Sequence, residues 1–185
     1  MTRPGQIHIP RLETARLVLR GPEARDLDVL AAFYASERSA FVGGPKDRAQ
    51  TWRQLGTEIG HWALKGFGRW MVELRSTGET VAMVGLWAPE GWPEAEIGWD
   101  VMNGHEGQGY ATEAARAARA FAYDVLGWTT AISLVAPGNG GSARLAARLG
   151  AAPDGQWTHD AFGRLDIWRH PGPDALAEGG AEAYA

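Results

Sequence analysis

The chain has 185 residues, of which 45% are hydrophobic and 22% charged, an ordinary balance for one globular domain with its own core. Its formal net charge of -4 argues against binding nucleic acid through a broad basic surface. Without cysteine, disulfides, thiolate metal sites and cysteine nucleophiles are excluded. The N-terminal residues lack an apolar signal core, and no apolar run could span a bilayer. We therefore expect a cytoplasmic protein with no membrane partner.

The first half of the chain is read from the spacing of its apolar residues. Alternation predicts strands, and stripes at helical spacing predict helices. The turn Ser76-Thr77-Gly78-Glu79 is typical of a hairpin. A rigid loop containing Pro89, Gly91 and Pro93 follows the hairpin. The expected elements are a strand at 16–20, helices at 24–36 and 48–64, and strands at 69–75 and 80–87.

Strands and helices alternate in the second half, which favours a mixed α/β sheet. A strand at 95–101 places Glu96, Gly98 and Asp100 on one face. Residues 1–10 form a loose start, and 171–185 are rich in Gly, Ala, Pro and acid, so a mobile tail is predicted there. The other expected elements are a helix at 112–125, a strand at 129–135, a helix at 142–149, and strands at 156–159 and 165–170.

A glycine-rich turn, Gly107-Gln108-Gly109, runs directly into the Ala-rich helix. The unpaired amides and positive dipole end of that helix suit an anion, most often a phosphate. A P-loop needs a Lys-Ser/Thr pair after the last glycine, but Tyr110-Ala111 stands there. A dinucleotide fingerprint needs a third glycine, but Thr112 occupies its position, and no acidic residue follows near Thr129. A different phosphate ligand is therefore indicated.

Three blocks of sequence, read together, resemble the GNAT superfamily of N-acetyltransferases. They are Glu96-Ile97-Gly98-Trp99, Gly107-Gln108-Gly109-Tyr110-Ala111-Thr112-Glu113-Ala114, and Asn139-x-x-Ser142 before Leu149-Gly150. Residues 12–20 are also similar to the first strand of the branch that includes ribosomal-protein and N-terminal alanine acetyltransferases. The resemblance covers about 11–170. It implies one α/β domain with a splayed mixed sheet flanked by helices, and acetyl-coenzyme A beside the fourth strand.

The resemblance also implies which residues bind acetyl-coenzyme A. The family's pyrophosphate loop, Gln/Arg-x-x-Gly-x-Gly/Ala, falls on 106–111, with Glu106 at the position of the usual Gln or Arg. Because backbone amides carry the contact, binding should survive, but an acid beside a pyrophosphate is unfavourable unless it turns to solvent. Thr112 adds a hydroxyl or is an ordinary first-turn residue. The implied cofactor residues are Trp99, Val101, Gly107, Gln108, Gly109, Tyr110, Ala111, Thr112, Asn139 and Ser142.

Acetyl transfer to an amine requires a base, a donor to the developing oxyanion and an acid for the leaving thiolate. Glu96 is the first choice for the base, directly or through a water, unless it is a surface carboxylate; Asp100 is the reserve. In the family a backbone amide of residues 99–101 would serve the oxyanion. The family's usual acid is a tyrosine, but Ala146 stands at its position. Ser142 would replace it, or would instead cap its helix, as Asn139 also could.

The expected function is acetyl-coenzyme A-dependent N-acetylation, with direct transfer to a primary amine of a protein N-terminus or a small molecule. The alternative is a non-catalytic acyl-coenzyme A-binding or regulatory module, which Ala146 and Glu106 motivate. The five histidines have no metal-ligand spacing, so no metal is expected. Trp52 and Trp62 are expected in the core, while Trp87 and Trp92 either wall the acceptor pocket or pack locally. The acceptor stays open, as does the choice between monomer and homodimer.

Overall fold

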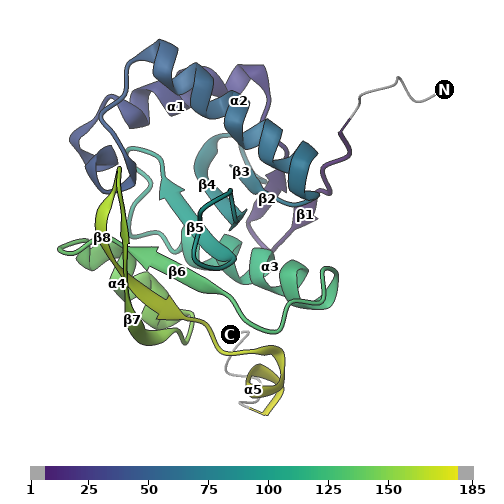
Figure 1. Ribbon diagram of the computed structural model, residues 1–185. Helices are drawn as coiled ribbons and strands as arrows, with labels where there is room; N and C mark the ends of the chain where they lie inside the picture. The colour runs from purple at the N-terminus through teal and green to yellow at the C-terminus, as the bar shows by residue number, and fades with distance from the viewer. Residues whose placement is uncertain (1–6, 179–185) are drawn as a thin grey trace.

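Eight strands form one open sheet in the order β1-β2-β3-β4-β5-β6-β8-β7 (Figure 1). The computed structural model describes residues 7–178. The strands are β1 (Leu12–Glu13), β2 (Leu17–Arg20), β3 (Arg69–Leu74), β4 (Thr80–Trp87), β5 (Glu96–Val101), β6 (Ile132–Val135), β7 (Ala152–His159) and β8 (Gly163–Arg169). The helices are α1 (Leu27–Tyr34), α2 (Arg48–Lys65), α3 (Tyr110–Asp124), α4 (Gly140–Arg148) and α5 (Pro173–Glu178), with 3-10 helices η1 (Ala24–Asp26) and η2 (Glu37–Val42).

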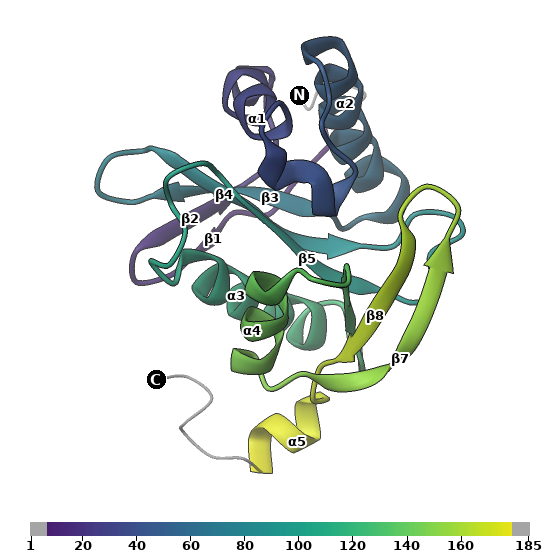
Figure 2. The ribbon, with the colours of Figure 1, turned by 90° about the vertical axis from the view of Figure 1, so that its left-hand side faces the viewer.

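Neighbouring strands are antiparallel throughout, with one exception: β5 and β6 run parallel. That exception follows from the chain order, because α3 carries the chain across the sheet between these two strands. Helices cover both faces. In Figure 2, α1 and α2 lie above the sheet, and α3 and α4 lie below it. The mixed α/β sheet expected from the sequence is confirmed.

Each face of the sheet has its own apolar cluster, because side chains alternate along the strands. On the face of α1 and α2, Leu30 and Leu55 pack with Met71 and Met83. On the other face, α3 presents a stripe of small side chains that are all buried: Ala111, Ala114, Ala115, Ala118 and Ala122. Their spacing places them on one side of the helix. Small residues there let α3 lie close to the sheet and fix the start of the helix near β5.

The ends of α2 show why this segment forms a long helix. The Asp47 carboxylate accepts from the amide of Gln50 at 2.7 Å, and the Gln50 side chain accepts from the amide of Asp47 at 2.8 Å. This reciprocal capping box satisfies amides that a helix start leaves unpaired. Gly66, with φ +76°, then ends the helix in the left-handed conformation. The fixed length of α2 sets the positions of Gln54 and Glu58 along it.

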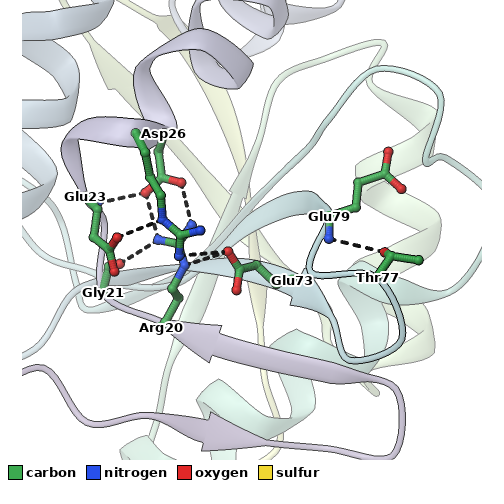
Figure 3. A network of polar contacts seen from close by, with 8 residues as sticks. Arg20, Gly21, Glu23, Asp26, Glu73, Thr77 and Glu79 are labelled. Carbon is green, nitrogen blue, oxygen red and sulfur yellow. Dashed lines mark hydrogen bonds and ion pairs between the residues drawn. The ribbon is translucent and has the colours of Figure 1, made fainter.

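A buried arginine fixes the start of the helical layer to the sheet (Figure 3). Arg20, at the end of β2, donates to both carboxylate oxygens of Asp26 at 2.6 and 2.8 Å and to Glu73 at 2.7 Å. Asp26 also accepts from the amide of Glu23 at 2.7 Å. The guanidinium therefore ties η1 to β2 and β3. Because α1 continues directly from η1, this network also positions Tyr34 at the far end of α1.

Several predicted boundaries differ from the structure. The helix expected at 24–36 divides into η1 and α1, because the Asp26 carboxylate turns back to Arg20 and to the Glu23 amide. The second 3-10 helix, η2, was not predicted. Strand β6 begins at Ile132 and not at residue 129, and β7 begins at Ala152 and not at residue 156.

Within the predicted mobile tail, residues 173–178 form α5, and the partly buried Leu176 packs against the core; 179–185 lie outside the described residues. Residues 7–10 carry no helix or strand, and 1–6 are also outside the described part. Trp62 is buried as predicted, but Trp52 is 64% exposed, so its assignment to the core is wrong.

No helix between residues 7 and 178 is long and apolar enough to cross a membrane.

Candidate active site

The site forms where β5 and β6 part. Strand β5 pairs with β4 along its whole length, but with β6 only at Glu96 and Ile132. Beyond that pair, side chains bridge the two strands: the Ser133 hydroxyl donates to the Ile97 carbonyl at 2.6 Å, and the Leu134 amide donates to Glu96 Oε1 at 3.1 Å. Residues 98–101 consequently have no ladder partner on the β6 side within the described chain. This opening is the splay that the sequence predicts.

A cavity of about 380 Å³ lies on the α3 and α4 side of the opening; we call it the donor cleft. Nine of the ten residues predicted to bind the cofactor line it, and they come from β5, the glycine turn, α3 and α4. Those nine are Trp99, Val101, Gly107, Gly109, Tyr110, Ala111, Thr112, Asn139 and Ser142. Gln108 does not line it: its side chain accepts from the Tyr110 hydroxyl at 2.9 Å, and its carbonyl accepts from Arg16 at 3.0 Å.

The glycine turn has the geometry of an anion cradle. Gly107 and Gly109 have φ of +73° and +80°, a region that other residues rarely adopt. A Cβ on Gly107 would meet no atom within 4 Å, so the space above it is open. Gly109 caps α3 without a side-chain hydrogen bond, which leaves the first amides of the helix for a ligand. These features fit the pyrophosphate of coenzyme A.

Side chains outside the motif hold this turn in place. The Glu113 carboxylate accepts from the Thr14 hydroxyl at 2.6 Å and from the amide and Nε of Arg16 at 3.0 and 2.7 Å. The Arg16 guanidinium lies over the Tyr110 ring, 4.8 Å from its centroid. Glu113 thus ties the segment before β2 to the first turn of α3.

The unusual acid of the loop, Glu106, is neutralised by a residue far away in the sequence. Arg38 Nη1, from η2, lies 2.7 Å from Glu106 Oε1. The same nitrogen donates to the Val101 carbonyl and to Asn103 Oδ1, both at 3.0 Å. Arg38 lines the donor cleft together with Glu106. Glu106 is therefore exposed but paired with a cation. Arg38 offsets the negative charge that Glu106 would place beside an anion, although Glu106 still lines the cleft.

A second cavity, of about 220 Å³, is lined by β5 together with residues of α2, β3 and the β7–β8 turn; we call it the acceptor cavity, after the acceptor pocket predicted at Trp87 and Trp92. Glu96 lines it and is only 8% exposed, so the alternative of a surface carboxylate is wrong. Its Oε2 accepts from Trp92 Nε1 at 2.7 Å, and its Oε1 from the Leu134 amide. Burial raises the pKa of Glu96 above its ordinary value, and these two hydrogen bonds partly oppose the rise.

The acceptor cavity has aromatic walls and a charged floor. Trp87 and Trp92 both line it, so they wall the pocket instead of packing only locally. Among the charged residues of the cavity, Arg69 pairs with Glu58 through two nitrogens and with Asp100 Oδ2 at 2.9 Å. Burial raises the pKa of Asp100, and the Arg69 charge works against that rise. Asp100, the reserve base, is thus already engaged with a cation.

The donor cleft and the acceptor cavity meet at the start of α4. Asn139 caps that helix, since its Oδ1 accepts from the amide of Ser142 at 3.1 Å. Ser142 is not the cap: its hydroxyl oxygen accepts from Trp99 Nε1 at 3.1 Å. Both cavities are lined by Trp99, Asp100, Asn139 and Ser142. Ala146, at the position of the missing tyrosine, is fully buried within α4 and lines neither cavity.

Several cations that line the two cavities are absent from the sequence-based assignment, among them Arg38, Lys46 and Arg69. Arg38 and Lys46 lie on or just after η2, and Arg69 begins β3. Only weak signals mark them. Lys46 is one of two lysines in a chain whose basic residues are otherwise arginine, and Arg69 precedes the apolar run Trp70-Met71-Val72. Neither signal indicates which cavity the residue lines.

The buried histidines have structural roles. His61 contacts the Phe67 carbonyl through Nδ1 at 2.7 Å, accepts from the Ala88 amide at 3.0 Å, and stacks on Trp87. His170 lies 2.9 Å from the Ser133 hydroxyl, and burial together with the Arg119 charge lowers its pKa to about 3. No group of three or more His, Asp or Glu in the described ranges could hold a metal ion.

Comparison with known proteins agrees with this geometry. The model of the acetyltransferase (GNAT) domain matches residues 16–152. The protein YkkB of Bacillus subtilis is 32% identical over 149 residues, covering 76% of this chain and 84% of that protein. The N-acetyltransferase YoaA of the same organism is 26% identical over 150 residues, 79% of this chain and 85% of the relative.

Solved structures extend the comparison to the fold. An acetyltransferase from Agrobacterium tumefaciens superposes with a TM-score of 0.81 and 36% identity, over 92% of this chain and 99% of that one. The ribosomal-protein-S5-alanine acetyltransferase of Vibrio fischeri (TM-score 0.69, 14% identity, 90% of this chain and 99% of that one) is similar in fold alone. The same holds for an aminoglycoside acetyltransferase in complex with coenzyme A (TM-score 0.73, 18% identity, 88% and 98%). The matched residues include β2 to β6 and most of the residues that line the two cavities. The chain therefore belongs to the GNAT acetyltransferase family and is an acyltransferase.

Proposed function

We propose that this protein transfers an acetyl group directly from acetyl-coenzyme A to a primary amine in the acceptor cavity. One observation carries the proposal: the two cavities meet at β5 and the start of α4, where the same residues line both. An acyl donor in one and an amine in the other would bring their reacting ends together there. Acetyl-coenzyme A supplies the acetyl group as a reactive thioester.

The donor would be held chiefly by backbone. The amides that follow Gly107 and Gly109, with the positive end of α3, suit the pyrophosphate. The open edge of β5 between 98 and 101 offers backbone amides to the acetyl oxygen, on which charge develops as the amine attacks. Side chains of Thr112 and Asn139 line the same cleft and are further candidates for contact.

Glu96 is proposed as the base. The amine must attack as the neutral species; as the C–N bond forms, its proton passes to Glu96 directly or through a water. A raised pKa suits this task, because a more basic carboxylate accepts the proton more readily. Each carboxylate oxygen accepts one hydrogen bond within the protein and keeps capacity for another.

Ser142 is proposed to assist the leaving group. As the C–S bond breaks, the sulfur departs as a thiolate and gains from a hydrogen bond. The Ser142 oxygen already accepts from Trp99, so its own proton can be donated to the sulfur. This arrangement offers a substitute for the tyrosine that Ala146 replaces.

Thiol release from acetyl-coenzyme A, measured across a panel of peptide N-termini and small amines, tests the proposal. We expect release that depends on the amine and yields the N-acetyl product by mass spectrometry. Saturable binding of acetyl-coenzyme A without turnover on any amine would favour the non-catalytic acyl-coenzyme A-binding module instead. The Asp47→Asn variant, altered at the exposed start of α2, serves as a control for general effects on stability.

A further inference from the structure

Of the two cations that line the acceptor cavity, Lys46 and Arg69, only Arg69 has an ion pair among the described residues. Lys46 Nζ donates to the neutral Gln54 Oε1 at 3.2 Å and lies 4.2 Å from the centroid of the Tyr34 ring. Between residues 7 and 178 it forms no ion pair. Arg69, by contrast, is held by Glu58 and Asp100. The ammonium is half-buried at the cavity wall, and its remaining N–H donors can serve a ligand.

The charges around the cavity narrow what the amine can be. Two carboxylates, Glu58 and Asp100, already face Arg69 and lie within electrostatic range of Lys46. Glu96, the other carboxylate that lines the cavity, forms no ion pair with the described residues, although the Arg69 charge acts on it at longer range. A polycation would therefore find one carboxylate and two positive groups. An acceptor with one amine and one acidic group would find a partner for each.

The walls of the cavity set the character of the acceptor's body. Six aromatic residues line it: Tyr34, Phe41, Trp87, Trp92, Trp99 and Phe162. Phe162, in the turn between β7 and β8, lies against Gly43 in the segment after η2, so that a Cβ on Gly43 would come within 2.8 Å of the ring. The two segments thereby close over the cavity. Such walls favour an apolar or aromatic group of limited size.

We propose that the acceptor is a compact apolar or aromatic primary amine that also carries a carboxylate, with Lys46 as the group that binds the carboxylate. This inference rests on the proposed function, because it names the substrate class of the same site. Burial lowers the pKa of Lys46 in the free protein. A bound carboxylate beside Lys46 would favour the charged form of the lysine. Lys46 is a specificity residue and takes no part in the proton transfers.

Matched pairs of amines test the proposal at two spacings: phenylalanine against phenylethylamine, and 4-(aminomethyl)benzoate against benzylamine. We expect the carboxylate to lower KM at least about tenfold in one pair, the ordinary worth of a charge-assisted hydrogen bond. Lys46→Met should erase that preference, so that the two amines of each pair have the same KM. Lys46→Arg should retain part of it. Lys65→Met, the other lysine, exposed at the end of α2, is the matched control.

The outcomes separate this inference from the proposed function. Equal KM values within both pairs, preference for spermidine, or a Lys46→Met variant that keeps the preference would overturn the acceptor class while acetyl transfer stands. If no amine releases thiol, the proposed function fails. Calorimetric binding of the same four compounds in the presence of coenzyme A then still decides the acceptor class. Tighter binding of the carboxylates, lost in Lys46→Met, supports it, and equal binding overturns it.

Discussion

The donor cleft and the acceptor cavity share β5, but backbone groups are prominent in the first and side chains in the second. The anion cradle of the donor cleft is formed by backbone: two left-handed glycines and the start of α3, which no side chain caps, beside the open edge of β5. The acceptor cavity is made of side chains from η2, α2, β3, β4, β5 and the β7–β8 turn. A site formed by backbone depends on the conformation of the chain and tolerates many substitutions. A site formed by side chains can change the ligand that it prefers through a single substitution. We expect changes in the two regions to separate donor binding from acceptor choice and chemistry.

The largest effect should come from filling the backbone site. Gly109→Trp places a large side chain at a position with φ of +80° beside the donor cleft, and should abolish measurable binding of coenzyme A by calorimetry. Gly78→Trp is the control, because Gly78 also has a positive φ (+74°) but lies in the β3–β4 turn. It carries the same backbone strain and should bind normally. Unchanged affinity in Gly109→Trp would remove the pyrophosphate assignment.

The next effect belongs to the chemistry between the two regions. Glu96→Gln should lower kcat about a hundredfold, a usual loss for a general base, with little change in the affinity for coenzyme A. Because the base must be ionised, wild-type activity should rise with pH through the raised pKa of Glu96, and the variant should lose that rise. Glu94→Gln, at the exposed partner of Arg169, is the control. An identical pH profile of kcat/KM in Glu96→Gln and wild type would exclude Glu96 as the base.

The smallest effect concerns the ion pair between Arg38 and Glu106 at the donor cleft. Arg38→Met leaves Glu106 unpaired beside the donor cleft and should weaken coenzyme A binding about threefold, as suits a half-exposed ion pair. The double variant with Glu106→Gln should recover wild-type affinity, and the loss should shrink in high salt. Calorimetry on the four proteins gives the coupling. Additive effects would mean that Arg38 does not act through Glu106.

The comparison also separates bulk charge from local charge. The net charge of -4 leans faintly towards a cationic acceptor. Within the acceptor cavity, however, Arg69 occupies two of the nearby carboxylates and Lys46 adds a second cation. Overall charge acts at long range, whereas recognition depends on the groups that lie within hydrogen-bonding distance of the ligand.

Predictability from sequence follows the range of the interactions. Some features depend on residues only a few positions apart: the capping box at Asp47 and Gln50, the alanine stripe of α3 and the turn at Gly78. The two helices and the hairpin that contain these features were predicted. The division of residues 24–36 was missed because Arg20 and Glu73 impose it from the sheet. Trp52 has helical spacing with core residues, yet lies on the outer side of α2 and is mostly exposed.

By itself, the sequence determined the glycine turn, the α/β order and hence the family, because glycine conformation, helix starts and apolar spacing are local properties of the chain. Only the tertiary structure brought Arg38 to Glu106, separated by 68 positions, and joined Lys46, Arg69 and Glu96 around one cavity. Those pairings depend on how α1, η2 and α2 dock on the sheet, which is decided by packing over the whole core. For that reason the donor side could be read from the sequence, and the acceptor side needed the fold.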